Sequence, residues 1–380
     1  MDFSLTEEQK MLQTMVRDFT EKEIAPIAAA IDEESRFPTE VVNKAAALGL
    51  FGIGYPEKYG GSGGGTVEQA IVFEELARVC AATCVIIAAS NELAAYPIYK
   101  TGTEVQKQNY LVPLLKGEKL GAFGLTEANA GSDVTALQTT AKRVDGGYIL
   151  DGTKIFITNG AEAEIIITFA TIDYTLGNKG ITAFIVEKGT KGFSVGKHER
   201  KMGIRASSTT ELIYDNCFVP TENRLGEQGS GLKIALSTID RSRISIAAQA
   251  TGIARGAFEK ALAYSKERRQ FGHEISAYQA IQWLLADMAT QIDAAHLLTH
   301  RAAYLSDIGK SFVKEASMAK VYAAETAIFV TNKALQIHGG YGFVKDFPLE
   351  RYYRDAKVTE IYEGTSEMQR WTIAKQLLKE

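Results

Sequence analysis

The stretch Gly147-Tyr148-Ile149-Leu150-Asp151-Gly152-Thr153-Lys154-Ile155-Phe156-Ile157-Thr158 decides the fold class of this 380-residue chain. Two short β-rich runs, 147–150 and 155–158, flank an Asp-Gly pair of the kind that separates strands. Similar runs occupy residues 120–125, 139–143, 165–170, 182–187 and 211–218, and no helix-periodic segment alternates with them. Because a parallel sheet needs crossover helices, an antiparallel barrel or sandwich is predicted between about residues 121 and 235.

The sequence on both sides of this β-rich part is helix-periodic. Thr6-Glu7-Glu8-Gln9 has the pattern of a capping box, and an apolar stripe at helical spacing follows it. Residues 242–268, 277–308, 314–337 and 367–378 form long amphipathic segments, which predict a helical bundle. We therefore expect an α+β fold, mostly α, in three domains: an N-terminal helical domain (1–120), a middle antiparallel β-barrel (121–235) and a C-terminal four-helix bundle (236–380).

Composition narrows the class of protein. A mean hydropathy of −0.08 is typical of a soluble globular protein. A net charge of −4 offers no basic surface for nucleic acid or membrane, and no apolar run has the length of a membrane span. Three cysteines and five scattered histidines show no zinc-binding spacing, so no metal is expected. The N-terminus has no signal-peptide or transit-peptide pattern, so we expect a cytoplasmic, bacterial protein.

A second informative stretch is Ile361-Tyr362-Glu363-Gly364-Thr365-Ser366-Glu367-Met368-Gln369-Arg370. Gly364 lets the backbone bend and approach a ligand closely, and Thr365 or Ser366 can cap the helix that follows. Glu363 is therefore held at the start of a helix. The simplest interpretation is an acidic residue that suits the helix dipole. The alternative is a carboxylate aimed at a ligand.

A third motif lies upstream, Ala122-Phe123-Gly124-Leu125-Thr126-Glu127-Ala128-Asn129-Ala130-Gly131-Ser132-Asp133, followed by Lys154-Ile155-Phe156-Ile157-Thr158-Asn159-Gly160. Together with the C-terminal stretch and the start Asp2-Phe3-Ser4-Leu5-Thr6-Glu7-Glu8-Gln9, it resembles the acyl-CoA dehydrogenases over essentially the whole chain. The resemblance is greatest to the bacterial short-chain (butyryl-CoA) type. It implies FAD as cofactor, a homotetramer, oxidation of a fatty acyl-CoA to its trans-2-enoyl-CoA, and electron-transferring flavoprotein as acceptor.

Within this resemblance, Glu363 matches the base that removes the α-proton while the β-hydride passes to the flavin. An α-proton is weakly acidic, so burial must raise the pKa of this carboxyl against the opposing helix dipole. The backbone N–H of Glu363 and a ribityl hydroxyl are expected to polarise the thioester oxygen. Some relatives carry the base at the position of Ser242, but serine cannot serve as that base.

The resemblance also assigns the contacts of the cofactor and the substrate. Thr126 is expected at the pyrimidine edge of the flavin, Thr158 near N5, and Phe156 as a flat apolar wall where many relatives have tryptophan. Arg268 is expected to reach the FAD of a neighbouring subunit, and His338 is interpreted as structural. The full set expected at FAD is Phe123, Leu125, Thr126, Ser132, Phe156, Thr158, Arg268, Phe271, Gln336, Gly340, Thr365 and Glu367. The set expected at the acyl-CoA is Ser132, Asp240, Arg243, Tyr362, Gly364, Asn91 and Glu92.

The acyl end of the site has two interpretations. Glu92 departs from the small or hydroxyl residues that relatives often have on this helix. It is either a carboxylate on the helix surface or a polar group at the distal end of a short, wide pocket, as in relatives that oxidise alicyclic acyl-CoAs. Butyryl, branched and cyclic substrates therefore stay open.

Other activities also fit the motifs. An enoyl-CoA reductase runs the same reaction in reverse, and an acyl-CoA oxidase or a flavin monooxygenase shares the fold. A scaffold without catalytic activity is disfavoured by the intact Glu363, Thr126 and Thr158.

Overall fold

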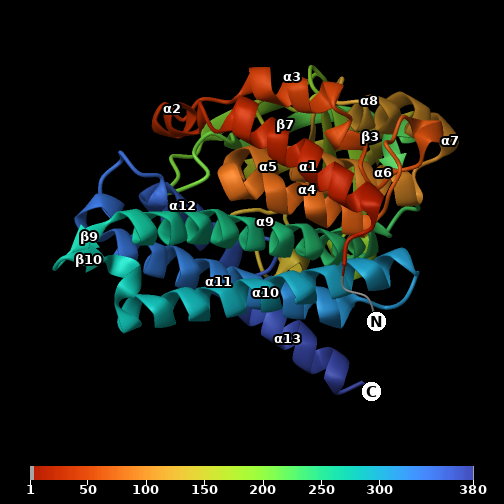
Figure 1. Cartoon of the computed structure of the whole chain (residues 1–380). Coiled ribbons are helices and arrows are strands. Elements are labelled where there is room, and N and C mark those ends of the chain that lie inside the picture. The colour runs from red at the N-terminus through yellow and green to blue at the C-terminus, as the bar shows by residue number, and fades with distance from the viewer. Residues whose placement is uncertain (1–3, 380) are drawn as a thin grey trace.

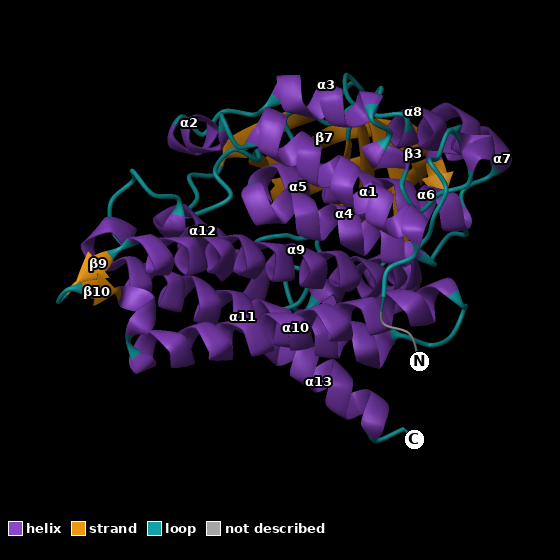
Figure 2. Cartoon of the chain, in the orientation of Figure 1, coloured by secondary structure: helices purple, strands orange, loops and turns teal. Residues whose placement is uncertain are grey.

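The computed structural model describes residues 4–379. Asp2 and Phe3, which belong to the family-like start of the chain, lie outside the described residues. Figure 1 shows short N-terminal helices at the top, a sheet behind them, and the long helices α9 (Gly231–Glu267), α10 (Gln279–Asp307) and α11 (Val313–His338) packed together below. Helices dominate, and the strands form one sheet apart from a short pair at residues 269–274 (Figure 2). The predicted α+β fold with its α–β–α order is confirmed.

The N-terminal helices begin as the sequence predicts. Thr6 caps α1 (Glu7–Phe19), and its side chain and that of Gln9 each accept a hydrogen bond from the other's backbone N–H, as in a capping box. The other helical elements here are η1 (Thr20–Ile24), α2 (Ala28–Glu33), α3 (Thr39–Ala47), η2 (Leu50–Gly52), η3 (Glu57–Tyr59), α4 (Thr66–Val79), α5 (Ala81–Ala88), η4 (Ala89–Ala95), α6 (Tyr96–Thr101), α7 (Glu104–Gln106), η5 (Lys107–Leu111) and α8 (Val112–Leu115).

One helical stretch, Ala81–Thr101, is more apolar than expected. Its mean hydropathy of 1.3 and its length would allow it to cross a membrane. However, 94% of that window is buried inside the protein. Cys80, Cys84 and Cys217 are buried free thiols, and Cys80 lies in the extended link between α4 and α5.

The strands form one mixed sheet with the order β6-β7-β3-β2-β4-β5-β8, and β1 pairs with β4. Most neighbouring strands are antiparallel, whereas β4 runs parallel to β1 and, at one residue pair, to β2. The strands are β1 (Gly121–Gly124), β2 (Thr140–Val144), β3 (Gly147–Thr158), β4 (Ile165–Thr171), β5 (Ile181–Glu187), β6 (Phe193–His198), β7 (Thr209–Pro220) and β8 (Arg224–Leu225).

The predicted break at Asp151-Gly152 is wrong, because residues 147–158 form the single 12-residue strand β3. Its pairing with β7 shifts register between Leu150 and Gly152 and again between Lys154 and Ile157. Asp-Gly signals a turn where a chain reverses, but here the chain continues and absorbs the pair as a bulge. At the second irregularity Phe156 has a φ of 58° and points outwards with 60% of its surface exposed.

The C-terminal helices confirm the predicted segments with two differences. Helix α9 begins at Gly231, earlier than predicted, because no Gly or Pro signal interrupts residues 232–242. Helix α12 (Leu349–Lys357) was missed because its sequence is dominated by charged and tyrosine residues. The remaining elements are the β9–β10 hairpin (Arg269–Gln270, His273–Glu274), short 3-10 turns, and α13 (Ser366–Leu377), which projects from the body in Figure 1. The domain boundaries at 120 and 235 stay a prediction.

Small residues bring α4 close to α9. A Cβ added to Gly252 would lie 2.3 Å from the carbonyl oxygen of Glu74, and one added to Gly256 would lie 2.1 Å from that of Arg78. Only glycine permits so close an approach of two backbones. The N-terminal helices are thereby packed directly on the C-terminal bundle.

Candidate active site

Glu363 lies on a strained turn between the 3-10 turn η11 (Val358–Glu360) and α13. Its φ is 51° and that of Gly364 is 90°, so two successive residues occupy left-handed conformations. For a residue with a side chain this costs about 1–3 kcal/mol and is typical of functional sites. Thr365 caps α13 by accepting a hydrogen bond from the N–H of Met368 at 3.4 Å, so it is Thr365, of the two predicted candidates, that caps the helix.

Two side chains hold this turn by hydrogen bonds to its carbonyl oxygens. The Nε2 atom of Gln369 donates to the carbonyl oxygens of Glu363 and Gly364 at 3.2 and 2.8 Å. The Nζ atom of the buried Lys320 donates to the Gly364 oxygen at 2.7 Å. The backbone N–H of Glu363 has no hydrogen-bond partner among residues 4–379. The turn therefore presents a free donor next to the carboxyl group.

The carboxyl group of Glu363 has a raised pKa, as a candidate base requires. Burial raises its pKa to about 7, although a hydrogen bond from Ser242 and the charge of Lys320 oppose that rise. The carboxylate of Glu92 adds to it. A carboxylate with a pKa near neutrality can hold a proton taken from carbon far better than an exposed one. Desolvation therefore outweighs the hydrogen bond from Ser242 and the charge of Lys320, as the expected chemistry requires.

Helix α9 supplies most of the other polar groups around this turn. Arg243 donates from Nη1 to Asp240 at 2.7 Å and to Ser317 at 3.3 Å, while its buried Nε has no partner among the described residues. The hydroxyl of Tyr362 donates to Gln249, so this side chain points towards α9. Ser242 was excluded as a base from sequence, but its role as a hydrogen-bond donor to Glu363 was missed, because serine at this position carries no such signal in a linear sequence.

The predicted flavin-contacting residues of the sheet also come together. The N–H of Ile155 donates to the carbonyl oxygen of Thr126 at 2.9 Å, which places the outward-facing Phe156 beside the end of β1. The hydroxyls of Thr126 and Thr158 have no hydrogen-bond partner in the described part of the chain, and Ser132 is exposed. A flat apolar wall with free hydroxyls at its edge fits an isoalloxazine ring.

A buried ion pair that was not predicted supports this wall. The Nζ atom of Lys154 lies 2.6 Å from Glu127 and donates to the Leu125 oxygen at 3.2 Å. Burial lowers the pKa of Lys154 to about 8 despite the carboxylate. Glu127 also accepts from the N–H and hydroxyl of Thr139. The charge pair thus fixes the loop that follows β1 to the bulged strand β3.

Four predicted FAD residues do not reach this site within the chain. Arg268 follows directly after α9, and Glu267 lies roughly 35–40 Å from Ser242 along that helix at ~1.5 Å per residue. The guanidinium of Arg268 lies 5.5 Å from the ring centroid of Tyr341, so the segment after α11 sits at the same end. This second group is Arg268, Phe271, Gln336 and Gly340. His338 beside it is buried and stacked on Tyr264, as its structural interpretation predicts.

Asn91 and Glu92, the residues predicted at the acyl end of the site, lie on the π-helical segment η4. The side-chain amide of Asn91 is fully engaged: Nδ2 donates to the Phe51 and Ile53 oxygens, and Oδ1 accepts from Gln69. The interpretation of Glu92 as a surface carboxylate is wrong, since it is 1% exposed. It pairs with Arg241, a residue that sequence reasoning missed.

The Glu92–Arg241 pair is enclosed. Arg241 Nε lies 2.9 Å from one oxygen of Glu92, and the guanidinium lies 4.7 Å from the ring centroid of Tyr96. The other oxygen of Glu92 is buried without a partner among the described residues. Burial, partly offset by Arg241, raises the pKa of Glu92. The surface interpretation failed because the partner comes from α9, far away in sequence.

Comparisons with known proteins agree with this geometry. The chain matches family models described as acyl-CoA dehydrogenase N-terminal domain (residues 6–118), middle domain (122–217) and C-terminal domain (229–378). It is 52% identical to a short-chain specific acyl-CoA dehydrogenase of Clostridium acetobutylicum over 100% of both chains. It is also 52% identical to an acryloyl-CoA reductase (NADH) of Anaerotignum propionicum, over 100% of this chain and 96% of the relative.

Solved structures show the same similarity. Butyryl-CoA dehydrogenase from Megasphaera elsdenii superposes with a TM-score of 0.98 at 47% identity over the whole of both chains. A second solved chain comes from a study of the electron transferring flavoprotein of Acidaminococcus fermentans. It superposes with a TM-score of 0.99 at 48% identity, again over the whole of both chains. The buried carboxylate, the bulged strand and the full-length matches lead to one conclusion: this chain belongs to the acyl-CoA dehydrogenase family of FAD-dependent oxidoreductases.

Proposed function

We propose that this acyl-CoA dehydrogenase oxidises a short-chain acyl-CoA to the 2-enoyl-CoA, with Glu363 as the base that removes the α-proton. The observation that carries the proposal is the buried carboxyl of Glu363, with a pKa of about 7, beside a free backbone N–H on the same strained turn. FAD, when bound, accepts the β-hydride. Removal of the α-proton, and part of the polarisation of the thioester oxygen, fall to groups of the chain itself.

Each of these groups has a distinct task. The N–H of Glu363 is placed to donate to the thioester oxygen, which makes the α-proton more acidic. The α-proton then passes to a carboxylate oxygen of Glu363, while the hydroxyl of Ser242 fixes the direction of that group. The buried Lys320 holds the turn through the Gly364 oxygen, so N–H and carboxylate keep their relative positions.

The first prediction tests the base. Glu363→Gln removes the proton acceptor but keeps the size of the side chain, so turnover with butyryl-CoA should fall about a thousandfold while FAD and acyl-CoA still bind. Anaerobic flavin bleaching measures turnover, and flavin absorbance with acyl-CoA titration measures binding. Retention of more than about a tenth of the activity would place the base elsewhere.

The second prediction concerns pH. Below its pKa the carboxyl of Glu363 is protonated and cannot accept the α-proton, so kcat/KM should rise with pH through about 7 and then level off. Ser242→Ala removes a donor that lowers this pKa, so the rise should move to higher pH. Ser265→Ala, a buried serine elsewhere on α9, is the matched control and should leave the profile in place. An unshifted profile in Ser242→Ala would contradict the assignment.

The enclosed Glu92–Arg241 pair supports a short acyl pocket. Arg241 directly precedes Ser242, and the charge of Glu92 acts on Glu363, so the pair lies within electrostatic reach of the base. A long apolar chain placed against it would leave buried polar atoms unpaired, which costs roughly 1–3 kcal/mol. A four-carbon acyl group would stop before it. Branched or alicyclic groups of similar length satisfy the same limit and are the alternatives.

The third prediction tests this pocket. Wild-type protein should prefer butyryl-CoA to octanoyl-CoA in kcat/KM, and Glu92→Leu combined with Arg241→Met should narrow that gap by about ten- to a hundredfold. Both charges are removed together because a single change would leave an unpaired buried charge. Arg241→Lys keeps the pair polar and should keep the preference. If octanoyl-CoA is already the best substrate of the wild type, the short-chain proposal fails.

The direction of the reaction in the cell has a second candidate. The 52% identity to an acryloyl-CoA reductase favours reduction of a short 2-enoyl-CoA, in which the protonated Glu363 would return the α-proton. For oxidation we propose electron-transferring flavoprotein as acceptor, supported by the similar chain from work on that flavoprotein. We also propose a cytoplasmic location, since the bacterial relatives are similar over the full chain.

We further propose a homotetramer in which each FAD contacts two chains. Arg268 is too far along α9 to reach the site of its own chain, and Phe271 in the same hairpin is 93% exposed. Trp283 on α10 and Trp371 on the projecting α13 are 61% and 55% exposed. Exposed aromatic side chains of this kind are typical of surfaces that pack against another chain.

The fourth prediction tests the shared cofactor. Arg268→Ala should lower flavin content and the tetramer fraction together, as measured by absorbance and gel filtration, because one residue serves both. Arg269→Ala changes a neighbouring cation that pairs with Glu274 in its own hairpin and serves as the control. Normal flavin content in a normal oligomer for Arg268→Ala would refute the shared site.

A further inference from the structure

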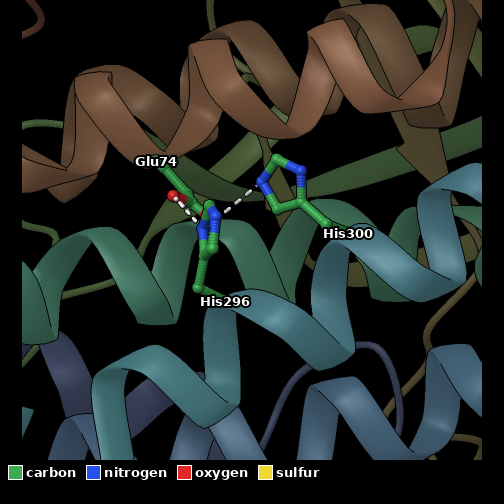
Figure 3. Close-up of side chains that lie close together, drawn as sticks. All are labelled: Glu74, His296 and His300. Carbon is green, nitrogen blue, oxygen red and sulfur yellow. Dashed lines mark hydrogen bonds and ion pairs between the residues drawn. The ribbon is translucent and has the colours of Figure 1, made fainter. Parts of the chain in front are cut away.

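A second cluster of ligand-type side chains lies away from the flavin site, between α4 and α10. Figure 3 shows His296 and His300 projecting from one helix towards Glu74 on the helix above. The two histidines are four residues apart, so both face the same side of α10. Glu74 is only 2% exposed and is held there because Gly252 lets α4 pack directly on α9.

The donor atoms have the spacing of a metal site. Nδ1 of His296 lies 3.0 Å from both oxygens of Glu74, and Nε2 of His300 lies 3.4 Å from one of them. All three donors lie within 4.8 Å of one another. A tetrahedral ion with bonds of about 2.0–2.1 Å separates its ligand atoms by roughly 3.3 Å. The distances of 3.0 and 3.4 Å from the nitrogens to the Glu74 oxygens lie on either side of that value.

The polar groups of this cluster are incompletely satisfied. Nε2 of His300 is buried and has no partner with hydrogen-bond geometry among the described residues. Buried ring nitrogens without a partner are uncommon in folded proteins. Two imidazoles and one carboxylate form the donor set that borderline divalent cations such as Zn²⁺ prefer. The open fourth position would be taken by water.

Arg255 on α9 is the competing cation. Its Nη2 atom lies 3.2 Å from Glu74 and 3.4 Å from Nδ1 of His296. Its Nη1 atom lies 3.9 Å from Glu75, which offers the guanidinium a second carboxylate. A metal ion and Arg255 would therefore compete for the carboxylate of Glu74, and binding of either one weakens binding of the other.

We propose that Glu74, His296 and His300 bind one divalent transition-metal ion of the zinc type, which links the N-terminal helix α4 to the bundle helix α10. The ion displaces Arg255 towards Glu75. Glu74 lies 222 residues before His296 in sequence, so the pattern of a zinc site is absent from the linear sequence. The site is separate from Glu363 and serves stability rather than chemistry.

The test uses full-length, FAD-loaded protein treated with a chelator and then dialysed against Zn²⁺. Metal analysis should find one tightly held ion per chain, and the ion should raise the thermal unfolding temperature. His300→Gln should lose the ion and the temperature rise while keeping flavin content and dehydrogenase activity. His198→Gln, an exposed histidine elsewhere, should behave as wild type. His296→Gln repeats the test should His300→Gln fail to fold.

Arg255→Gln distinguishes a metal site from a network of ion pairs. Removal of the competing cation should tighten Zn²⁺ binding by about tenfold or more, since a nearby positive charge repels the ion. In a plain ion-pair network the same change destabilises the protein and zinc does not restore it. Absence of zinc from both wild type and Arg255→Gln, or zinc retained in both histidine variants, overturns the proposal.

Discussion

Desolvation of one carboxyl group is the constraint on which the site depends. The base that we propose, Glu363, needs a pKa near 7, and burial raises its pKa against the opposing effects of the Ser242 hydrogen bond and the Lys320 charge. Lys320 is also needed to hold the strained turn, together with Gln369. The protein therefore accepts a backbone conformation that costs free energy in order to place an N–H and a carboxyl group on one turn.

The β-sheet carries the apolar wall that is predicted to contact the flavin. A regular strand would alternate its side chains and bury every second one, but the irregularity of β3 turns Phe156 outwards beside Thr126. Beneath this surface the Lys154–Glu127 pair takes up the polar groups of the loop after β1. The bulge in β3 thus orients Phe156, and the buried Lys154–Glu127 pair keeps this part of the sheet in place.

Several charge pairs connect helices that are far apart in the sequence, and each has a different structural role. Glu92 on η4 pairs with Arg241 on α9, and in the function that we propose this pair limits the length of the acyl group. The contacts of Glu74 with Arg255 and His296 join α4 to α9 and α10, and they connect the N-terminal helices to the C-terminal bundle. Arg268 and Phe271 lie at the opposite end of the bundle from Glu363, and the division of FAD contacts between chains that we propose would make assembly and cofactor binding interdependent.

The sequence by itself determined the α–β–α order of the chain, the capping box at Thr6 and the family motif around Glu363, because these are local patterns. It left the cap of the last helix open between Thr365 and Ser366. It misplaced the break in β3, since Asp-Gly forms a turn or a bulge depending on the neighbouring strand. The burial of Glu92, its pairing with Arg241, the hydrogen bond from Ser242 and the meeting of Glu74 with two histidines were decided only by the tertiary structure. Each depends on side chains from helices far apart in the chain, whose approach is set by packing such as that of Gly252 on α4.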